Sequence, residues 1–206
     1  MGIARLASDL RKLPIAQEVA DRVSEFRLLG KKGSQAWFSE LSFCVLTANA
    51  TAQKGIELQE KIGHGFLTLV ETQLQAKLKC HGYRFHTRAG FIVYNRRFSN
   101  LKDIILRFRT SAEAREWLAK NVMGVGYKEA SHFLRNVGFM DVAILDRHIL
   151  NVMKEYGVIM EIPKALTPKK YLEIEKALLP LSRTTKLSLG ELDLYLWYMK
   201  TSKVLK

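Results

Sequence analysis

The sequence predicts an all-α fold, long enough for one large domain or two small helical lobes. Apolar residues recur at intervals of three and four along most of the chain, as on the buried face of a helix, and the strict alternation of a strand is scarce. The 206 residues, of which 48% are hydrophobic, are enough for a sizeable core and exclude general disorder. A pair of glycines between two helical stretches in the second half of the chain predicts a tight helical hairpin.

The first half of the chain predicts five helices. Apolar residues at helical spacing mark the first, which Pro14 ends, and a second that stops near Gly30–Gly33, a run that we interpret as a linker. Ser34 is the expected N-cap of a strongly apolar third helix. Residues 51–80 predict two more helices, with a break around residues 63–65.

The second half continues the helical pattern. Segments 89–93 and 101–108 are apolar at helical spacing, and Ser111 is expected to cap the first helix of the hairpin. Thr167–Pro168 predicts an N-cap followed by proline at the first helical position. A last helix carries the apolar residues between 189 and 199, before a polar-to-basic tail.

The charge balance favours a polyanionic partner. Lys and Arg number 33 against 20 Asp and Glu, which gives a net charge of +13 and a pI of about 9.8. Nucleic acid is the commonest partner of such a surplus. A protein of the membrane surface would carry a long basic amphipathic helix at a terminus, and no apolar run reaches the length of a membrane span. We therefore expect a monomer in the cytoplasm, associated with the nucleoid and not with membranes.

Cysteine usage is sparse. Cys44 and Cys80 are the two cysteines of the chain, and they are expected to be reduced thiols. Two thiols cannot complete a four-cysteine iron–sulfur cluster. We expect no such cluster and no required cofactor.

The hairpin lies within the stretch Leu118–Asp146, around which we expect the chain to be organised. Gly124 and Gly126 flank Val125, so the backbone turns sharply there and no side chain blocks a partner. The helix that follows opens with unpaired N–H groups, and a helix N-terminus of this kind binds phosphate. A helix–helix turn without a ligand is the simpler alternative.

Two charged residues follow the hairpin. Lys128 stands at the start of the second helix, and Asp146 comes eighteen positions later, just before apolar residues at helical spacing. Taken singly, Lys128 is an ordinary solvated lysine or a phosphate clamp, and Asp146 is an N-cap. Their combination with the hairpin is rarer than either residue alone.

The hairpin, Lys128 and Asp146 together resemble the signature of the helix-hairpin-helix DNA glycosylases. The wider match is most similar to the archaeal-type 8-oxoguanine DNA glycosylase/AP lyases and differs from the endonuclease III branch, many of whose members carry an iron–sulfur cluster. The match covers nearly the whole chain, and its segments are Phe38–Leu41, Leu46–Ala50, Tyr83–Arg84 and Ile144–His148. The resemblance implies one lobe of residues 33–146, a second of residues 1–32 with 147–206, and a DNA-binding cleft between them.

The resemblance also implies an activity. A bifunctional enzyme of this kind excises 8-oxoguanine from double-stranded DNA through a lysine Schiff base and cleaves the strand at the abasic site. Lys128 would be the nucleophile, and Asp146 would assist its deprotonation and stabilise positive charge on the sugar. The target base must leave the duplex to reach them.

Further roles follow from the residue types and from the resemblance. Lys206 and Trp197 would recognise the base, and the expected DNA contacts are Asn49, Arg84, Phe85, Gly124, Gly126 and His148. The backbone carbonyls of Lys120, Val122 and Val125 would hold a monovalent cation. The family often has proline before the first hairpin glycine, where this chain has Met123.

Plainer interpretations of these residues stay open. Asn49 would satisfy local hydrogen bonds at a helix end, and Phe85 and Trp197 would lie in the core. Two alternatives to the implied function also stay open. One is a glycosylase for another oxidised base, and the other is a non-catalytic helix-hairpin-helix DNA-binding protein, which needs only the glycines and the basic surplus.

Overall fold

The computed structural model describes residues 2–206, and this part of the chain is helical without a β-strand, as the sequence predicts. The helices are α1 (Ile3–Leu10), α2 (Ile15–Lys31), α3 (Ser34–Thr47), α4 (Ala52–Ile62), α5 (Gly65–Thr68), α6 (Glu71–Cys80), α7 (Arg88–Asn95), the 3₁₀ helix η1 (Arg96–Phe98), α8 (Leu101–Ile105), α9 (Ser111–Asn121), α10 (Tyr127–Asn136), α11 (Arg147–Glu155), α12 (Pro168–Thr185) and α13 (Leu189–Thr201).

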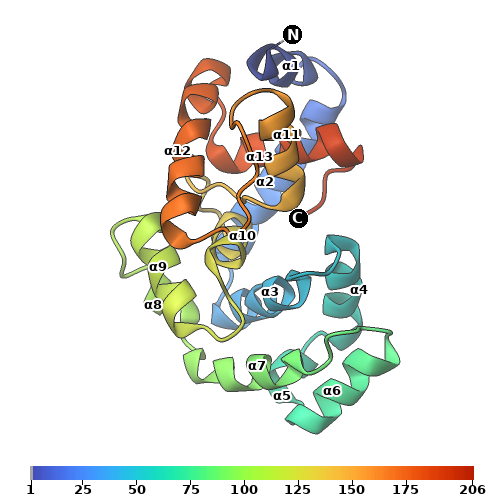
Figure 1. Ribbon diagram of the computed structural model, residues 1–206. Helices are drawn as coiled ribbons and strands as arrows, with labels where there is room; N and C mark the ends of the chain where they lie inside the picture. The colour runs from blue at the N-terminus through green and yellow to red at the C-terminus, as the bar shows by residue number, and fades with distance from the viewer. Residues whose placement is uncertain (1) are drawn as a thin grey trace.

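The buried side chains form two hydrophobic clusters. One is built from residues between Trp37 and Val142, and the other from residues 3–26 and 143–196. Figure 1 shows the same grouping: α3 to α9 lie below, α1, α2 and α11 to α13 lie above, and α10 runs between them. The limits of the two expected lobes stay a prediction: the first cluster lies within residues 33–146, whereas the second also contains Ala143 and Leu145, which the prediction gave to the first lobe. The chain end lies between the two groups, close to α4.

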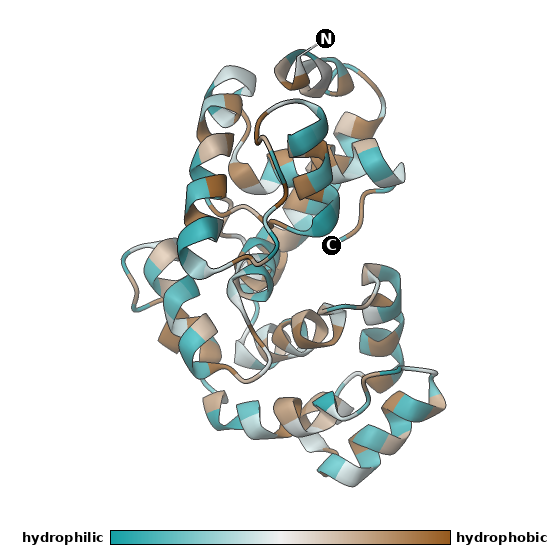
Figure 2. Ribbon diagram, viewed as in Figure 1, coloured by the Kyte–Doolittle hydropathy of each residue, from teal (hydrophilic) through white to brown (hydrophobic). Residues whose placement is uncertain are grey.

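Amphipathic helices build both clusters. Figure 2 shows hydrophobic and hydrophilic bands that alternate along most of the helices, as expected where one helix face is buried and the other is solvated. The largest fully buried side chains include Trp37 and Phe133, whose rings meet edge to face with centroids 5.8 Å apart. Among the described residues, none of the helices combines the length and apolar character that crossing a bilayer requires.

Three local predictions from the sequence are wrong. Gly33, and not Ser34, is the N-cap of α3, and Ser34 is the first helical residue. Gly30 belongs to α2, which continues to Lys31, so the linker is limited to Lys32 and Gly33. A Cβ at Gly30 would meet the carbonyl of Val137, so this glycine serves close packing of α2 against the end of α10.

The cap of α9 is also one residue earlier than expected. Thr110 is the N-cap, and its hydroxyl accepts from the N–H of Glu113, whose carboxylate accepts in turn from the N–H of Thr110. This reciprocal pair is a capping box. Ser111 is instead the first helical residue, and its hydroxyl donates to Asp141 at 2.5 Å. The expected caps Asp146 and Thr167 are confirmed, since each side chain accepts from a backbone N–H three residues later.

Candidate active site

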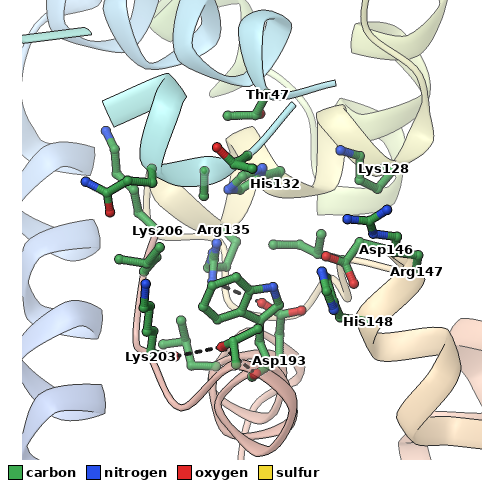
Figure 3. Close-up of a pocket in the computed structure, with 18 of the residues that line it drawn as sticks. Thr47, Lys128, His132, Arg135, Asp146, Arg147, His148, Asp193, Lys203 and Lys206 are labelled. Carbon is green, nitrogen blue, oxygen red and sulfur yellow. Dashed lines mark hydrogen bonds and ion pairs between the residues drawn. The ribbon is translucent and has the colours of Figure 1, made fainter. Parts of the chain in front are cut away.

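A cavity of about 780 Å³ opens between the two groups of helices. Its walls come from the α3–α4 junction, from α10, from the segment 144–148, and from α13 with the tail that follows it. Figure 3 shows side chains from all of these parts turned toward one space. Segments far apart in the sequence therefore meet here.

Lys128 and Asp146 both line this cavity. Figure 3 places them on the same side, with Lys128 on α10 and Asp146 at the start of α11. The Lys128 side chain is 26% exposed, and its Nζ lies 3.0 Å from a carboxylate oxygen of Glu129. The two residues that the sequence singled out thus share one pocket, which a catalytic pair requires and a pair of unrelated surface residues does not.

Asp146 has a structural role as well. Its carboxylate accepts a hydrogen bond from the N–H of Ile149 at 2.8 Å, and so caps α11. A carboxylate bonded in this way to a helix N-terminus is held in one orientation. The cap and a position in the pocket are therefore compatible.

A side chain of α7 holds the hairpin turn by hydrogen bonds. The side-chain amide of Asn95, a buried residue, accepts from the N–H of Met123 and donates to its carbonyl, both at 2.9 Å. Proline at position 123 could not make the first of these bonds. Gly124 follows with φ +79°, and a Cβ there would come 2.6 Å from the ring of Phe91. Two hydrogen bonds thus fix the turn at Met123.

We expect Asn95→Ala to loosen the hairpin and weaken DNA binding. The change leaves the backbone N–H and carbonyl of Met123 without their Asn95 partners, and each lost hydrogen bond costs about 0.5–1.5 kcal/mol. The affinity for duplex DNA, measured by fluorescence anisotropy at fixed salt, should fall about tenfold, with a lower Tm. Asn100→Ala is the matched control, because Asn100 makes no side-chain cap hydrogen bond. Equal affinities for wild type and Asn95→Ala would show that the turn does not contact DNA.

The N–H groups beyond the turn are not all free. The Glu129 carboxylate accepts from the N–H of Gly126 at 3.3 Å as well as pairing with Lys128. The expected phosphate seat is therefore partly occupied by a carboxylate of the chain itself. A phosphate at this N-terminus would compete with Glu129 for Gly126, which the spacing of the hairpin alone did not reveal.

Asn49 lies at the mouth of the cavity in a left-handed turn, with φ +54°, and is exposed. The guanidinium of Arg88 holds this turn, donating from one nitrogen to the carbonyl of Ala48, and to those of Val45 and Leu46 at 3.2 and 3.4 Å. Cations commonly satisfy the last carbonyls of a helix. Arg88, which sequence reasoning missed, thus presents Asn49 to the pocket.

Residues 83–85, in the loop before α7, differ in how deeply they are buried. Tyr83 is buried and donates from its hydroxyl to the carbonyl of Leu46 at 2.6 Å. Phe85 is half-buried against Tyr83, with ring centroids 6.0 Å apart, and Arg84 is exposed. Neither Arg84 nor Phe85 lines the cavity. Their expected insertion into DNA stays a prediction.

Trp197 and His148 line the same wall of the cavity. Their rings meet edge to face with centroids 6.2 Å apart. Trp197 is half-buried and packs against the second hydrophobic cluster, so one part of its ring system belongs to the core and another faces the cavity. The position of Trp197 suits both interpretations, core residue and stacking platform, and its contact with a base stays a prediction.

Three ionisable residues of the cavity wall were missed in the sequence. Arg135 donates to the Asp193 carboxylate at 3.0 Å, and both side chains are buried. Burial raises the pKa of Asp193 to about 7, although Arg135 opposes this and Asp146 adds to it. Burial also lowers the pKa of His132 well below its ordinary value, so its imidazole is neutral at pH 7. In the sequence, each of these three residues is an ordinary polar position on an amphipathic helix.

Lys206 reaches the cavity from the tail. Its amine donates to the Glu40 carboxylate at 2.8 Å and to the side-chain carbonyl of Gln59, and lies 4.2 Å from the centroid of the Phe43 ring. The amine is therefore engaged by α3 and α4 and not directed at a ligand. The main-chain end of Lys206, which lies beside His132, is left to face the cavity.

The described residues contain no cluster of three or more His, Cys, Asp or Glu arranged for a metal ion. The hairpin carbonyls are a different kind of donor, suited to a hard monovalent cation. The carbonyl of Val122 accepts from the N–H of Val125 at 3.3 Å and keeps a second lone pair. The binding of a monovalent cation by the backbone carbonyls of Lys120, Val122 and Val125 stays a prediction.

Known proteins resemble this chain over almost its whole length. Residues 19–187 match the family model described as 8-oxoguanine DNA glycosylase. The chain belongs to the 8-oxoguanine DNA glycosylase family. The 8-oxoguanine DNA glycosylase/AP lyase of Methanocaldococcus jannaschii is 50% identical over the full length of both chains, and that of Korarchaeum cryptofilum is 47% identical, again over both full lengths.

Solved structures of this family agree with the fold. The Methanocaldococcus jannaschii 8-oxoguanine glycosylase/lyase, in complex with a 15mer DNA containing 8-oxoguanine, superposes with a TM-score of 0.97 over 99% of each chain at 50% identity. The 8-oxoguanine DNA glycosylase of Thermotoga maritima gives a TM-score of 0.93 at 42% identity, over 99% of this chain and 98% of its own. The resemblance drawn from the hairpin, Lys128 and Asp146 is confirmed.

Proposed function

We propose that this member of the 8-oxoguanine glycosylase family excises 8-oxoguanine from double-stranded DNA and cleaves the strand at the abasic site. The observation that carries the proposal is the shared cavity of Lys128 and Asp146 beside the hairpin. The relatives of highest similarity described above are named for both activities, and one of them is solved with a DNA that contains 8-oxoguanine. The net charge of +13 suits a polyanionic substrate.

The first step that we propose is nucleophilic substitution at the sugar. The Lys128 amine attacks the anomeric carbon, the bond from that carbon to the base breaks, and the electron pair leaves with the base, which takes up a proton. Lys128 must first lose a proton, because an ammonium group has no lone pair. Asp146 would accept it, directly or through water, and its charge would stabilise the positive sugar in the transition state.

The second step is elimination. The sugar ring opens as the bond between the anomeric carbon and the ring oxygen breaks, which leaves an imine between that carbon and Lys128. The imine makes the hydrogen on the adjacent sugar carbon acidic, and loss of that proton expels the 3′ phosphate. Water then releases Lys128. These steps require no cofactor, because each bond that forms is matched by one that breaks and only protons and water are exchanged.

Recognition of the base would fall to Lys206 and Trp197. 8-Oxoguanine carries a hydrogen on ring nitrogen 7 that guanine lacks, so an acceptor aimed at this N–H distinguishes the two bases. The Lys206 amine is engaged by Glu40, which leaves the main-chain oxygen of Lys206 as the acceptor. The half-buried ring of Trp197 would support the flipped base by stacking.

The remaining contacts of the proposal concern the DNA backbone and the opposite strand. Asn49 would fill the space beside the orphaned partner base, and His148 would bind a flanking phosphate. A monovalent cation on the hairpin carbonyls would assist phosphate binding next to Gly124. We place the protein in the cytoplasm, where it would act on the nucleoid.

A panel of duplexes, each with a single lesion, tests the substrate. Single-turnover excision should be fastest for 8-oxoguanine, and unmodified guanine should react more slowly by at least about a hundredfold, because the discriminating hydrogen bond is absent. Faster cutting of a thymine glycol duplex would contradict the choice of base. DNA binding without product from any lesion would instead favour a non-catalytic helix-hairpin-helix protein.

A further inference from the structure

The Lys206 amine sits in a socket formed by α3 and α4. Glu40 is only 2% exposed, and its Oε2 accepts from Lys206 at 2.8 Å and from the side-chain amide of Gln59 at 3.1 Å. Gln59 accepts from the same amine through its carbonyl, and the Phe43 ring closes the socket. A lysine with two polar partners and an aromatic neighbour, in a side chain 17% exposed, is a built contact and not a solvated end.

The socket is the end of a buried polar chain that crosses the molecule. The other oxygen of Glu40 accepts from Asn136 at 2.6 Å, the Asn136 carbonyl accepts from Arg135 at 2.8 Å, and Arg135 donates to Asp193 at 3.0 Å. This chain joins α3, α10 and α13, which belong to both hydrophobic clusters. A carboxylate with hydrogen bonds on both oxygens is held rigidly, so the position of Glu40 is fixed before Lys206 reaches it.

The tail has few other attachments. After α13, Ser202 adopts the left-handed conformation with φ +54°, and the chain then crosses toward α4. Val204 packs against the second hydrophobic cluster, and its carbonyl accepts from Arg22 at 3.5 Å, a long contact, so both attachments lie on the side of α2 and α13. The salt bridge from Lys206 to Glu40 is therefore the main attachment of the tail on the far side of the cavity.

We propose that Glu40, assisted by Gln59, is the positioning residue that sets base discrimination by docking Lys206. With the amine held in the socket, the main chain of Lys206 is presented to the cavity beside His132, whose neutral imidazole adds no charge. The inference rests on the proposed excision of 8-oxoguanine. Glu40 touches no substrate in this account and acts only through Lys206.

Two substrates distinguish a role of Glu40 in base recognition from a general role in catalysis. A duplex with 8-oxoguanine requires base recognition, whereas a duplex with a preformed abasic site requires only Lys128 and the backbone contacts. We expect Glu40→Gln to slow 8-oxoguanine excision by about tenfold or more, since it removes a charge-assisted hydrogen bond to Lys206. Cleavage of the abasic-site duplex should keep most of its rate. Glu60→Gln, an exposed position on α4, is the charge-matched control.

A second variant removes the other partner of the contact between Lys206 and Glu40. Lys206→Met removes the amine and keeps the main chain, so the inference is testable even if Glu40→Gln folds poorly. Because the two residues act through one contact, the double variant should be no slower than the slower single variant.

The outcomes are distinct. Wild-type excision rates in both single variants, additive losses in the double variant, or an equal loss on the abasic-site duplex would overturn the role of Glu40. Wild-type protein that cleaves abasic sites but releases no 8-oxoguanine would overturn the proposed function, and the inference with it.

Discussion

Replacing Lys128 with glutamine should abolish both base release and strand cleavage. Glutamine keeps the length and polarity of the side chain but has no amine lone pair, so no covalent intermediate forms. Removal of an enzyme nucleophile costs about a thousandfold or more in rate. The rates of base release and of strand cleavage, measured separately in single-turnover assays, should both fall by this factor.

Binding should be affected far less than catalysis. Lys128 is one of 33 Lys and Arg residues, and a single charge contributes a modest share of phosphate binding. Lys169→Gln, an exposed change of the same charge on α12, serves as the control. If Lys128→Gln released the base at the wild-type rate, the nucleophile would be water or another residue.

Asp146→Asn is expected to separate the charge of this residue from its cap. Asparagine is as good an N-cap as aspartate, so the hydrogen bond from the Ile149 N–H is kept. The free energy of unfolding should therefore change by less than about 1 kcal/mol. The rate of excision should fall by about a hundredfold or more, because the negative charge beside the sugar is lost. Thermal unfolding and single-turnover kinetics measure the two effects.

Two further variants complete this test. Asp146→Ala loses charge and cap together, and its stability should fall by about 0.5–2 kcal/mol. Thr167→Ala removes a comparable cap from α12, away from the cavity, and should lower stability with no loss of excision rate. Full activity in Asp146→Asn would reduce Asp146 to its structural role.

The hairpin, Lys128 and Asp146 could be located from the sequence because their signals are local. Glycines in a turn, an apolar stripe on each side and an aspartate before a helix are each set by neighbours within a few positions. The same local physics placed Asp146 and Thr167 correctly as caps. It failed at Ser111, since Thr110 and Ser111 are both good caps and only Thr110 has Glu113 three positions on.

The polar side chains around the cavity could not be predicted, because their partners are distant in sequence. Arg135 pairs with Asp193 58 positions away, and Asn136 with Glu40 96 positions away. On a helical wheel each is one more polar residue. Only the packing of α3, α10 and α13 turns them into a buried chain, and the docking of Lys206 follows from that packing.

Trapping with borohydride tests the central claim most directly, because it reduces an imine between protein and sugar to a stable amine. Wild-type protein incubated with an 8-oxoguanine duplex and borohydride should yield a covalent complex, with the sugar attached to Lys128 in the digested peptide, and Lys128→Gln should yield none. A complex formed by Lys128→Gln in wild-type yield, or a wild-type attachment at any other residue, would contradict the account.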